Sequence, residues 1–206
     1  RDVDRDAVEE VVVPRARRAL DDVTAYLGID FDQPIVIDLS TIHGVPRQWR
    51  NNIYLPADRV GKADKLGLSI VHEITHVVAI SADRFDRGRF YDDGLAVYLQ
   101  TRFGQVSSFP DFGRDLHEET VAVAESEGGF LPLATTEHTR RNTRSASERR
   151  LAYLQKGSFT RFLIELAGLE DYWRVYRGES LDAVYGRDLA ALEAEWLVAI
   201  TGKASP

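Results

Sequence analysis

The most informative stretch of the chain is Leu68-Ser69-Ile70-Val71-His72-Glu73-Ile74-Thr75-His76-Val77-Val78. Its apolar residues predict a largely buried helix, and four residues advance a helix by about 400°. His72 and His76 are therefore about 40° apart around the axis, so both imidazoles can reach one cation. Glu73 is about 100° round from His72. That position is too far round for a natural third ligand, but it suits a base that takes a proton from a metal-bound water.

The same stretch has a second interpretation, in which the two histidines are ordinary residues of a helical core. Against it, the chain has only five His in 206 residues. Polar groups on a strongly apolar helix are costly to bury unless they find partners. The His-Glu-x-x-His spacing also has a mechanical reason in metal binding. We therefore favour a metal site that includes His72 and His76.

Composition describes a globular and acidic chain, with 44 % hydrophobic and 29 % charged residues. The net charge of −7 argues against a nucleic-acid partner. The absence of Cys excludes disulfides and Cys-ligated metals. No apolar run approaches the roughly 18 residues of a membrane span, so we expect no membrane segment. The chain begins at Arg1 and contains no Met, so we expect a removed leader or anchor and a place outside the cytoplasm.

Hydrophobic periodicity predicts an α+β fold that is mostly helical, with a small N-terminal mixed sheet. We expect strands over residues 34–39 and 52–56, a loop over 40–46 and irregular chain over 130–147. The expected helices cover residues 6–13 and 15–27 with a kink at Pro14, then 62–81, 92–102, 110–127, a helix from a Ser145–Glu148 capping box to Ala167, 170–177, 180–185 and 188–201.

These elements predict one domain over residues 1–206. Within it we expect an N-terminal helix over 1–28, a part with the sheet and the metal helix over 29–104, and a helical part over 105–206.

A candidate third ligand lies in the stretch Phe90–Tyr98. Asp93-Gly94-Leu95-Ala96, which begins 17 residues after His76, resembles the Glu-Gly-x-Ala-like segment of gluzincin metallopeptidases, the thermolysin and aminopeptidase N type. In that family the glutamate of this segment is the third zinc ligand. Aspartate is one methylene shorter, so its helix must lie closer or the site must bind metal less well. Asp92 is the alternative ligand, and both aspartates could instead form an N-cap pair.

The resemblance implies a zincin-like fold with one Zn²⁺ held by His72, His76 and Asp93. It also implies hydrolysis of a peptide or protein substrate, with Glu73 as the general base. No amine-binding Gly-x-Met-Glu-Asn segment is present, which favours an endopeptidase over an aminopeptidase. The alternative function is a catalytically weak or inactive relative that serves as a binding or regulatory module.

The resemblance assigns two further roles. Tyr153 opens a stretch, Tyr153–Leu163, that is similar to a helix of small bacterial gluzincin-like proteins. A tyrosine there faces the zinc, so Tyr153 is implied to donate a hydrogen bond to the substrate oxygen; the alternative is a packing tyrosine. Asn52, Ile53 and Tyr54 are implied to form the edge strand along which the peptide substrate lies.

The remaining histidines, His43, His117 and His138, have no ligand spacing, and we expect them at the surface. A local basic patch indicates either a solvated face or a surface that steers an acidic peptide. This patch consists of Arg140, Arg141, Arg144, Arg149 and Arg150.

Overall fold

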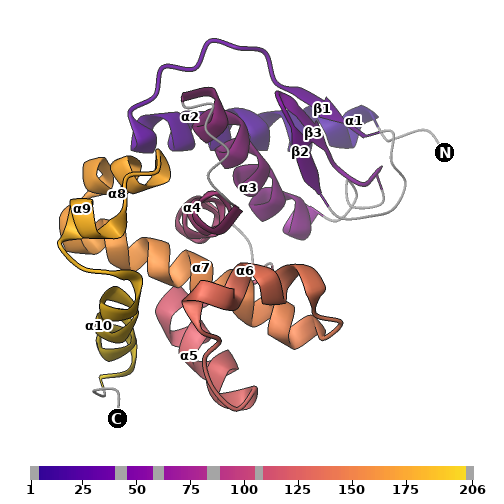
Figure 1. Cartoon of the computed structure of the whole chain (residues 1–206). Coiled ribbons are helices and arrows are strands. Elements are labelled where there is room, and N and C mark those ends of the chain that lie inside the picture. The colour runs from indigo at the N-terminus through magenta and orange to yellow at the C-terminus, as the bar shows by residue number, and fades with distance from the viewer. Residues whose placement is uncertain (1–4, 40–45, 58–62, 83–88, 105–108, 203–206) are drawn as a thin grey trace. The chain divides into compact units, whose positions relative to one another are not determined.

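The computed structural model of the chain describes residues 5–39, 46–57, 63–82, 89–104 and 109–202 (Figure 1). Contacts group the chain into two compact units. The first unit comprises Arg1–Arg84 and Leu99–Ser108, and the second comprises Phe85–Tyr98 and Phe109–Pro206. The single domain expected over residues 1–206 stays a prediction, and the division between the units falls inside a helix rather than after residue 104.

The first unit begins with one long helical segment. It consists of α1 (Arg5–Ala7), the π-helical turn η1 (Val8–Val12) and α2 (Val13–Leu27). Pro14 lies in the first turn of α2 and has no N–H to continue the helical hydrogen bonds, and the irregular turn directly precedes it. Gly28 ends the helix in the left-handed conformation, with φ +65°. The predicted N-terminal helix and its end at Gly28 are therefore confirmed, and a π-helical turn precedes Pro14, where a kink was expected.

A three-stranded mixed sheet follows, with β1 (Val36–Asp38), β2 (Arg47–Trp49) and β3 (Asn52–Tyr54). The strand order is β1-β3-β2, with β1 parallel and β2 antiparallel to β3. Sequence reasoning missed β2, because it has only three residues and two of them, Arg47 and Gln48, are polar. A two-residue turn at Arg50 and Asn51 joins it to β3.

The position of β3 corrects the prediction of an edge strand for substrate. Asn52, Ile53 and Tyr54 pair with β1 on one side and with β2 on the other. The side chain of Ile53 is fully buried. Because both of its hydrogen-bonding edges are taken, β3 has no edge left for strand addition, and the outer strands of the described sheet are β1 and β2.

Helix α3 (Ala63–Ala82) is the helix predicted over residues 62–81. It packs against α2 and against β2 and β3 in the first unit (Figure 1). Its apolar positions are buried as the periodicity predicts, namely Ile70, Val71, Ile74, Val77 and Val78. Because these apolar side chains must face the core, they fix how the helix is rotated about its axis. That rotation in turn sets the direction of the His-Glu-x-x-His side chains.

Helix α4 (Arg89–Phe103) runs through both units, since Arg89–Tyr98 belongs to the second and Leu99–Phe103 to the first. The rest of the second unit is helical. Its elements are α5 (Leu116–Ser126), α6 (Leu133–Asn142), α7 (Ala146–Ala167), α8 (Leu169–Tyr176), α9 (Leu181–Tyr185) and α10 (Leu189–Thr201). In the described residues, no helix is both long and apolar enough to span a membrane.

The last four helices confirm the predicted pattern. Ser145 caps α7 by accepting a hydrogen bond from the Glu148 N–H at 3.2 Å, and Gly168 ends it. Glu148 completes the cap through the Thr143 hydroxyl rather than through the Ser145 N–H, and Ser145 N–H donates to the same hydroxyl at 3.0 Å. The capping box is thus extended by one residue that the sequence pattern did not include.

Two expectations in the second unit are wrong. The segment expected to be irregular contains α6, which carries ion pairs from Glu137 to Arg140 and Arg141 and packs against α7. These contacts override the weak helix propensity of its threonines. The helix expected from Pro110 begins only at Leu116, because Asp115 caps it and the residues before it form turns.

Helices α4 and α7 pack with their backbones close together in the second unit. A Cβ on Gly94 would overlap the Thr160 hydroxyl and lie 2.9 Å from the Lys156 carbonyl oxygen. A Cβ on Gly157 would overlap the side chain of Val97. The glycine that follows Asp93 therefore has a structural reason, since it brings the α7 side chains within reach of that carboxylate.

Candidate metal centre

The two histidines of α3 direct the same ring nitrogen toward each other. His72 Nε2 and His76 Nε2 are 3.2 Å apart, and the rings meet edge to face with centroids 4.8 Å apart. Two nitrogens at about 2.05 Å from a tetrahedral zinc are about 3.3 Å apart, from the zinc–nitrogen distance alone. The spacing of the pair therefore matches one edge of a zinc site.

Gln100 orients the first of these rings from the C-terminal part of α4. Its amide Oε1 is 2.8 Å from His72 Nδ1, within the first unit. An amide oxygen only accepts, so Nδ1 carries the proton and Nε2 keeps its lone pair. Gln100 is buried, which protects this hydrogen bond from water. A neutral histidine with its second nitrogen so fixed is the usual form of a metal-bound imidazole.

Glu73 follows His72 on the same helix and is only 5 % exposed. It is about 100° round the helix from His72, as the sequence predicts. Its carboxylate is therefore largely shielded from bulk water, on the same stretch of helix as the two histidines.

Asp93 is held by two cations of the second unit. Its Oδ2 accepts a hydrogen bond from Lys156 Nζ at 3.0 Å and lies 3.2 Å from Arg140 Nε. Lys156 is fully buried and also pairs with Glu137. Arg140 in turn donates to both carboxylate oxygens of Glu137, at 2.8 and 3.0 Å. Asp93, Glu137, Arg140 and Lys156 form what we call the charge quartet, with two anions and two cations.

Contacts within the charge quartet shift the pKa values of Glu137 and Arg140. Burial would raise the pKa of Glu137, but hydrogen bonds from Arg140 and Lys156 outweigh it and lower that pKa to about 2. The hydrogen bond to Glu137 raises the pKa of Arg140 above its usual value. Glu137 and Arg140 are therefore both charged at neutral pH. Buried charges of this kind persist only while each has its partner.

Asp92 lies elsewhere, although it is the next residue to Asp93. Its Oδ1 accepts a hydrogen bond from the Tyr176 hydroxyl at 3.1 Å. The N-cap interpretation of the two aspartates is wrong, because α4 begins at Arg89 and both lie inside the helix. Helix geometry turns Asp92 about 100° from Asp93, which separates their surroundings.

Tyr153 joins the charge quartet through Arg140. Its hydroxyl accepts a hydrogen bond from Arg140 Nη1 at 3.2 Å, and Phe109 meets its ring edge to face at 5.5 Å. Burial raises the pKa of Tyr153, and the charge of Asp93 raises it further. Tyr153 is thus a neutral hydroxyl in the group of side chains that surrounds Asp93.

The other histidines differ from one another. His117 is half-buried rather than fully exposed: its Nδ1 is 2.7 Å from Ser158 Oγ, and burial lowers its pKa. Ser158 also accepts a hydrogen bond from Trp196 at 2.9 Å, so this group is an internal link between helices. His138 is exposed on α6, as predicted. His43 lies outside the described residues.

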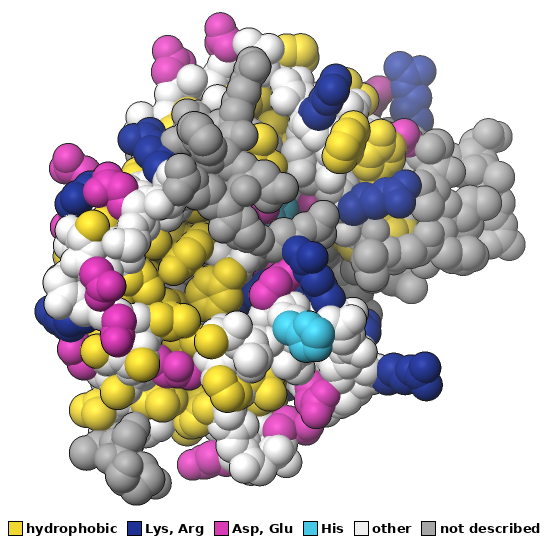
Figure 2. All heavy atoms as spheres, viewed as in Figure 1, with side chains coloured by type: hydrophobic (Ala, Val, Ile, Leu, Met, Phe, Trp, Pro, Cys, Tyr) yellow, Lys and Arg dark blue, Asp and Glu magenta, His cyan; other side chains and the backbone are white. Residues whose placement is uncertain are grey.

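The arginine cluster is largely neutralised. Arg140 and Arg141 pair with Glu137, and Arg150 pairs with Glu119. Figure 2 shows Lys and Arg side chains interspersed with Asp and Glu on the face drawn, rather than one continuous basic field. The exposed arginines of the cluster therefore belong to a solvated face, which was one of the two expectations. Arg140 differs, because it belongs to the charge quartet.

Sequence reasoning missed Gln100 and three members of the charge quartet, Lys156, Arg140 and Glu137. Two of the four had a usable signal. Gln100 follows Asp93 by seven residues and Lys156 follows Tyr153 by three, so each shares a helix face with a predicted site residue. Comparison with protein-family models, curated proteins and solved structures finds no match for the chain.

Proposed function

We propose that the protein is a zinc-dependent peptidase in which His72, His76 and Asp93 bind one Zn²⁺. The main support is the pair of Nε2 atoms at 3.2 Å, with the tautomer of His72 fixed by Gln100. Among the residues that the structure describes, the two histidines and Asp93 form a group that could hold a metal ion. Asp93 also precedes Gln100 by two turns of α4 and is about 20° from it around the axis.

The short aspartate is compatible with this role. Its Oδ2 contacts Lys156 and Arg140, and a carboxylate has a second oxygen that suits zinc. Close packing of α7 at Gly94 keeps these partners in place. Because Lys156 and Arg140 orient Asp93, the carboxylate would lose little conformational freedom on binding metal.

A zinc ion so bound would lower the pKa of a coordinated water toward about 7 and polarise a substrate carbonyl. Glu73 would accept the proton of the attacking water and deliver it to the leaving amine. Tyr153 would donate a hydrogen bond to the carbonyl oxygen as it gains charge. A peptide would add to the outer strand β2, which contacts α3, rather than to β3.

The test combines metal analysis with one conservative variant. Protein saturated with zinc and then dialysed should retain about one equivalent. Glu73→Gln should retain the metal and lose cleavage of a mixed peptide library, since only the base is removed. Glu125→Gln, an exposed change on α5, is the matched control and should cleave like the wild type. Failure to retain zinc would reject the site.

A metal-binding module without catalysis is the second candidate function. The observation in its favour is the charge quartet, because two cations on Asp93 reduce its strength as a ligand. Retained zinc without any cleavage by the wild type would support this candidate. Cleavage that Glu73→Gln abolishes would exclude it.

A further inference from the structure

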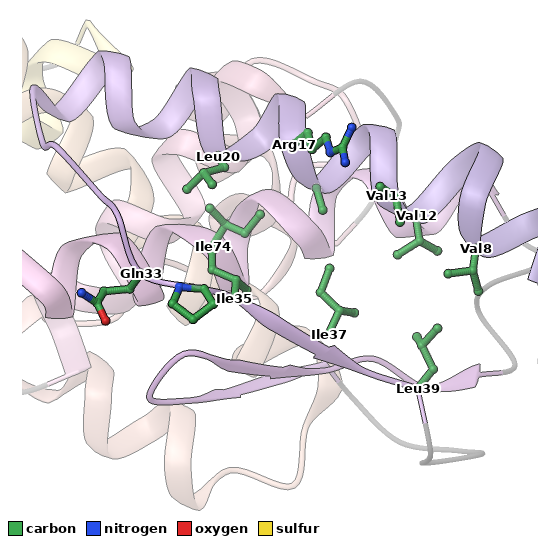
Figure 3. Close-up of a pocket in the computed structure, with 12 residues that line it drawn as sticks. Val8, Val12, Val13, Arg17, Leu20, Gln33, Ile35, Ile37, Leu39 and Ile74 are labelled. Carbon is green, nitrogen blue, oxygen red and sulfur yellow. The ribbon is translucent and has the colours of Figure 1, made fainter.

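The first unit contains an apolar pocket, lined by its N-terminal helical segment, by residues in and beside β1, and by Ile74 of α3. Its volume is about 490 Å³, within the range of small-molecule sites. Figure 3 shows it between the N-terminal helical segment and β1. It is lined by Val8, Val12, Val13, Ala16, Arg17, Leu20, Gln33, Pro34, Ile35, Ile37, Leu39 and Ile74.

The side chains that line the pocket are mostly aliphatic. Ile35, Ile37 and Leu39 alternate along one chain segment, so they line the same side of it. The opposite wall includes Val8 and Val12 from the π-helical turn η1. Such turns are rare and often mark functional sites. None of the described residues that line the pocket is aromatic, which favours a flexible aliphatic occupant over a flat one.

Arg17 is the charged residue of the lining. Within the described part of the chain it has no hydrogen bond or ion pair, and its side chain is exposed. The next residue, Arg18, does pair with Asp22 at 3.6 Å. A cation without a partner at the wall of an aliphatic pocket is complementary to an anionic head group on an apolar chain.

We propose that this pocket binds a fatty acid, with the acyl chain between α2 and β1 and the carboxylate on Arg17. The chain would bury its methylenes against the aliphatic walls, and Arg17 would donate two parallel hydrogen bonds to the carboxylate. This site is separate from the proposed peptidase chemistry and does not depend on bound zinc.

The test measures binding of octanoate, decanoate and dodecanoate by calorimetry, below their micelle concentrations. Affinity should rise about fourfold for each added methylene, the value expected for full burial. Arg17→Gln should weaken the binding of dodecanoate by about tenfold or more, because it removes a charged hydrogen-bond donor. It should leave dodecanol unchanged. Arg18→Gln is the matched control on the same helix and should not weaken either ligand.

A second variant tests the pocket independently of the charge. Ala16→Phe should fill the space and abolish binding of dodecanoate, with a circular dichroism spectrum and melting temperature that show an intact fold. Equal affinity for octanoate and dodecanoate would overturn the proposal. So would equal effects of Arg17→Gln and Arg18→Gln, or binding of an apolar helical peptide in preference to every fatty acid.

Discussion

The proposed ligands come from two regions with opposite surroundings. The histidines of α3 lie among apolar side chains, and the partner of His72 is the neutral amide of Gln100. Asp93 lies in the charge quartet, where its carboxylate contacts two cations. One region is organised by hydrophobic burial and the other by ion pairing.

This difference shows how each kind of ligand is kept in its binding form. A histidine needs the correct neutral tautomer, and one uncharged acceptor is enough to fix it. A buried carboxylate needs compensation for its lost hydration, and neighbouring cations supply that. The histidine region should therefore affect metal affinity with little effect on stability, whereas the carboxylate region should affect both.

The largest effect is expected for Asp93→Ala. It removes a proposed ligand, so the zinc dissociation constant should rise by more than about 100-fold, beyond the effect of losing an outer contact. The free energy of unfolding should also fall, because Lys156 and Arg140 lose an anionic partner. Chelator competition and urea unfolding measure the two. Asp92→Ala, which removes the acceptor of the Tyr176 hydrogen bond, is the control and should keep its zinc.

Lys156→Met sharpens the comparison by acting on stability. It removes a fully buried cation and leaves two carboxylates undercompensated, so the free energy of unfolding should fall by about 3–5 kcal/mol. Arg141→Met removes a half-exposed partner of Glu137 and should cost less than about 1 kcal/mol. Equal urea midpoints for the two variants would show that burial does not set the strength of the charge quartet.

Gln100→Leu tests the histidine region. It removes the hydrogen-bond acceptor of His72 Nδ1, so the dissociation constant for zinc should rise by about 10–100-fold. Gln100→Glu keeps an acceptor oxygen and should restore most of the affinity. Unchanged zinc affinity in Gln100→Leu would mean that the tautomer of His72 is fixed by some other group.

The last prediction concerns the pH dependence of the free energy of unfolding. Glu137 has a folded pKa of about 2, below its ordinary value of 4.5. Its contribution is therefore complete above pH 4.5 and is lost as the pH falls toward 2. Glu137→Gln should flatten this part of the stability curve, measured by urea unfolding between pH 5 and about pH 2.5. A curve as steep as that of the wild type would assign the acid sensitivity to other carboxylates.

Local patterns were enough to predict much of the fold. Helix α3 followed from its apolar period, and α7 followed from Ser145 at its start and Gly168 at its end. By contrast, α6 depends on ion pairs and on packing against α7, which no local pattern contains. Strand β2 is short and two of its three residues are polar, so its own residues gave no signal. It forms by pairing with β3, whose central Ile53 is fully buried.

The candidate site divides in the same way. His72, Glu73 and His76 lie within five residues of one helix, so their arrangement follows from helix geometry. The contact between Asp93 and Lys156 joins residues 63 apart, and the close approach of α4 and α7 that allows it depends on Gly94 and Gly157. The sequence could suggest Asp93 only by resemblance, and it could not reveal the cations around it.

Ile74 links the aliphatic pocket to the helix that carries the histidines. It lines the aliphatic pocket, and it lies between Glu73 and Thr75 in the turn that carries both histidines. A lipid in the pocket would therefore rest on the back of that turn. If the lipid changes the affinity for zinc, thermodynamic reciprocity requires that zinc change the affinity for the lipid by the same factor. Preparations stripped of metal and preparations stripped of lipid would then each misreport the other ligand.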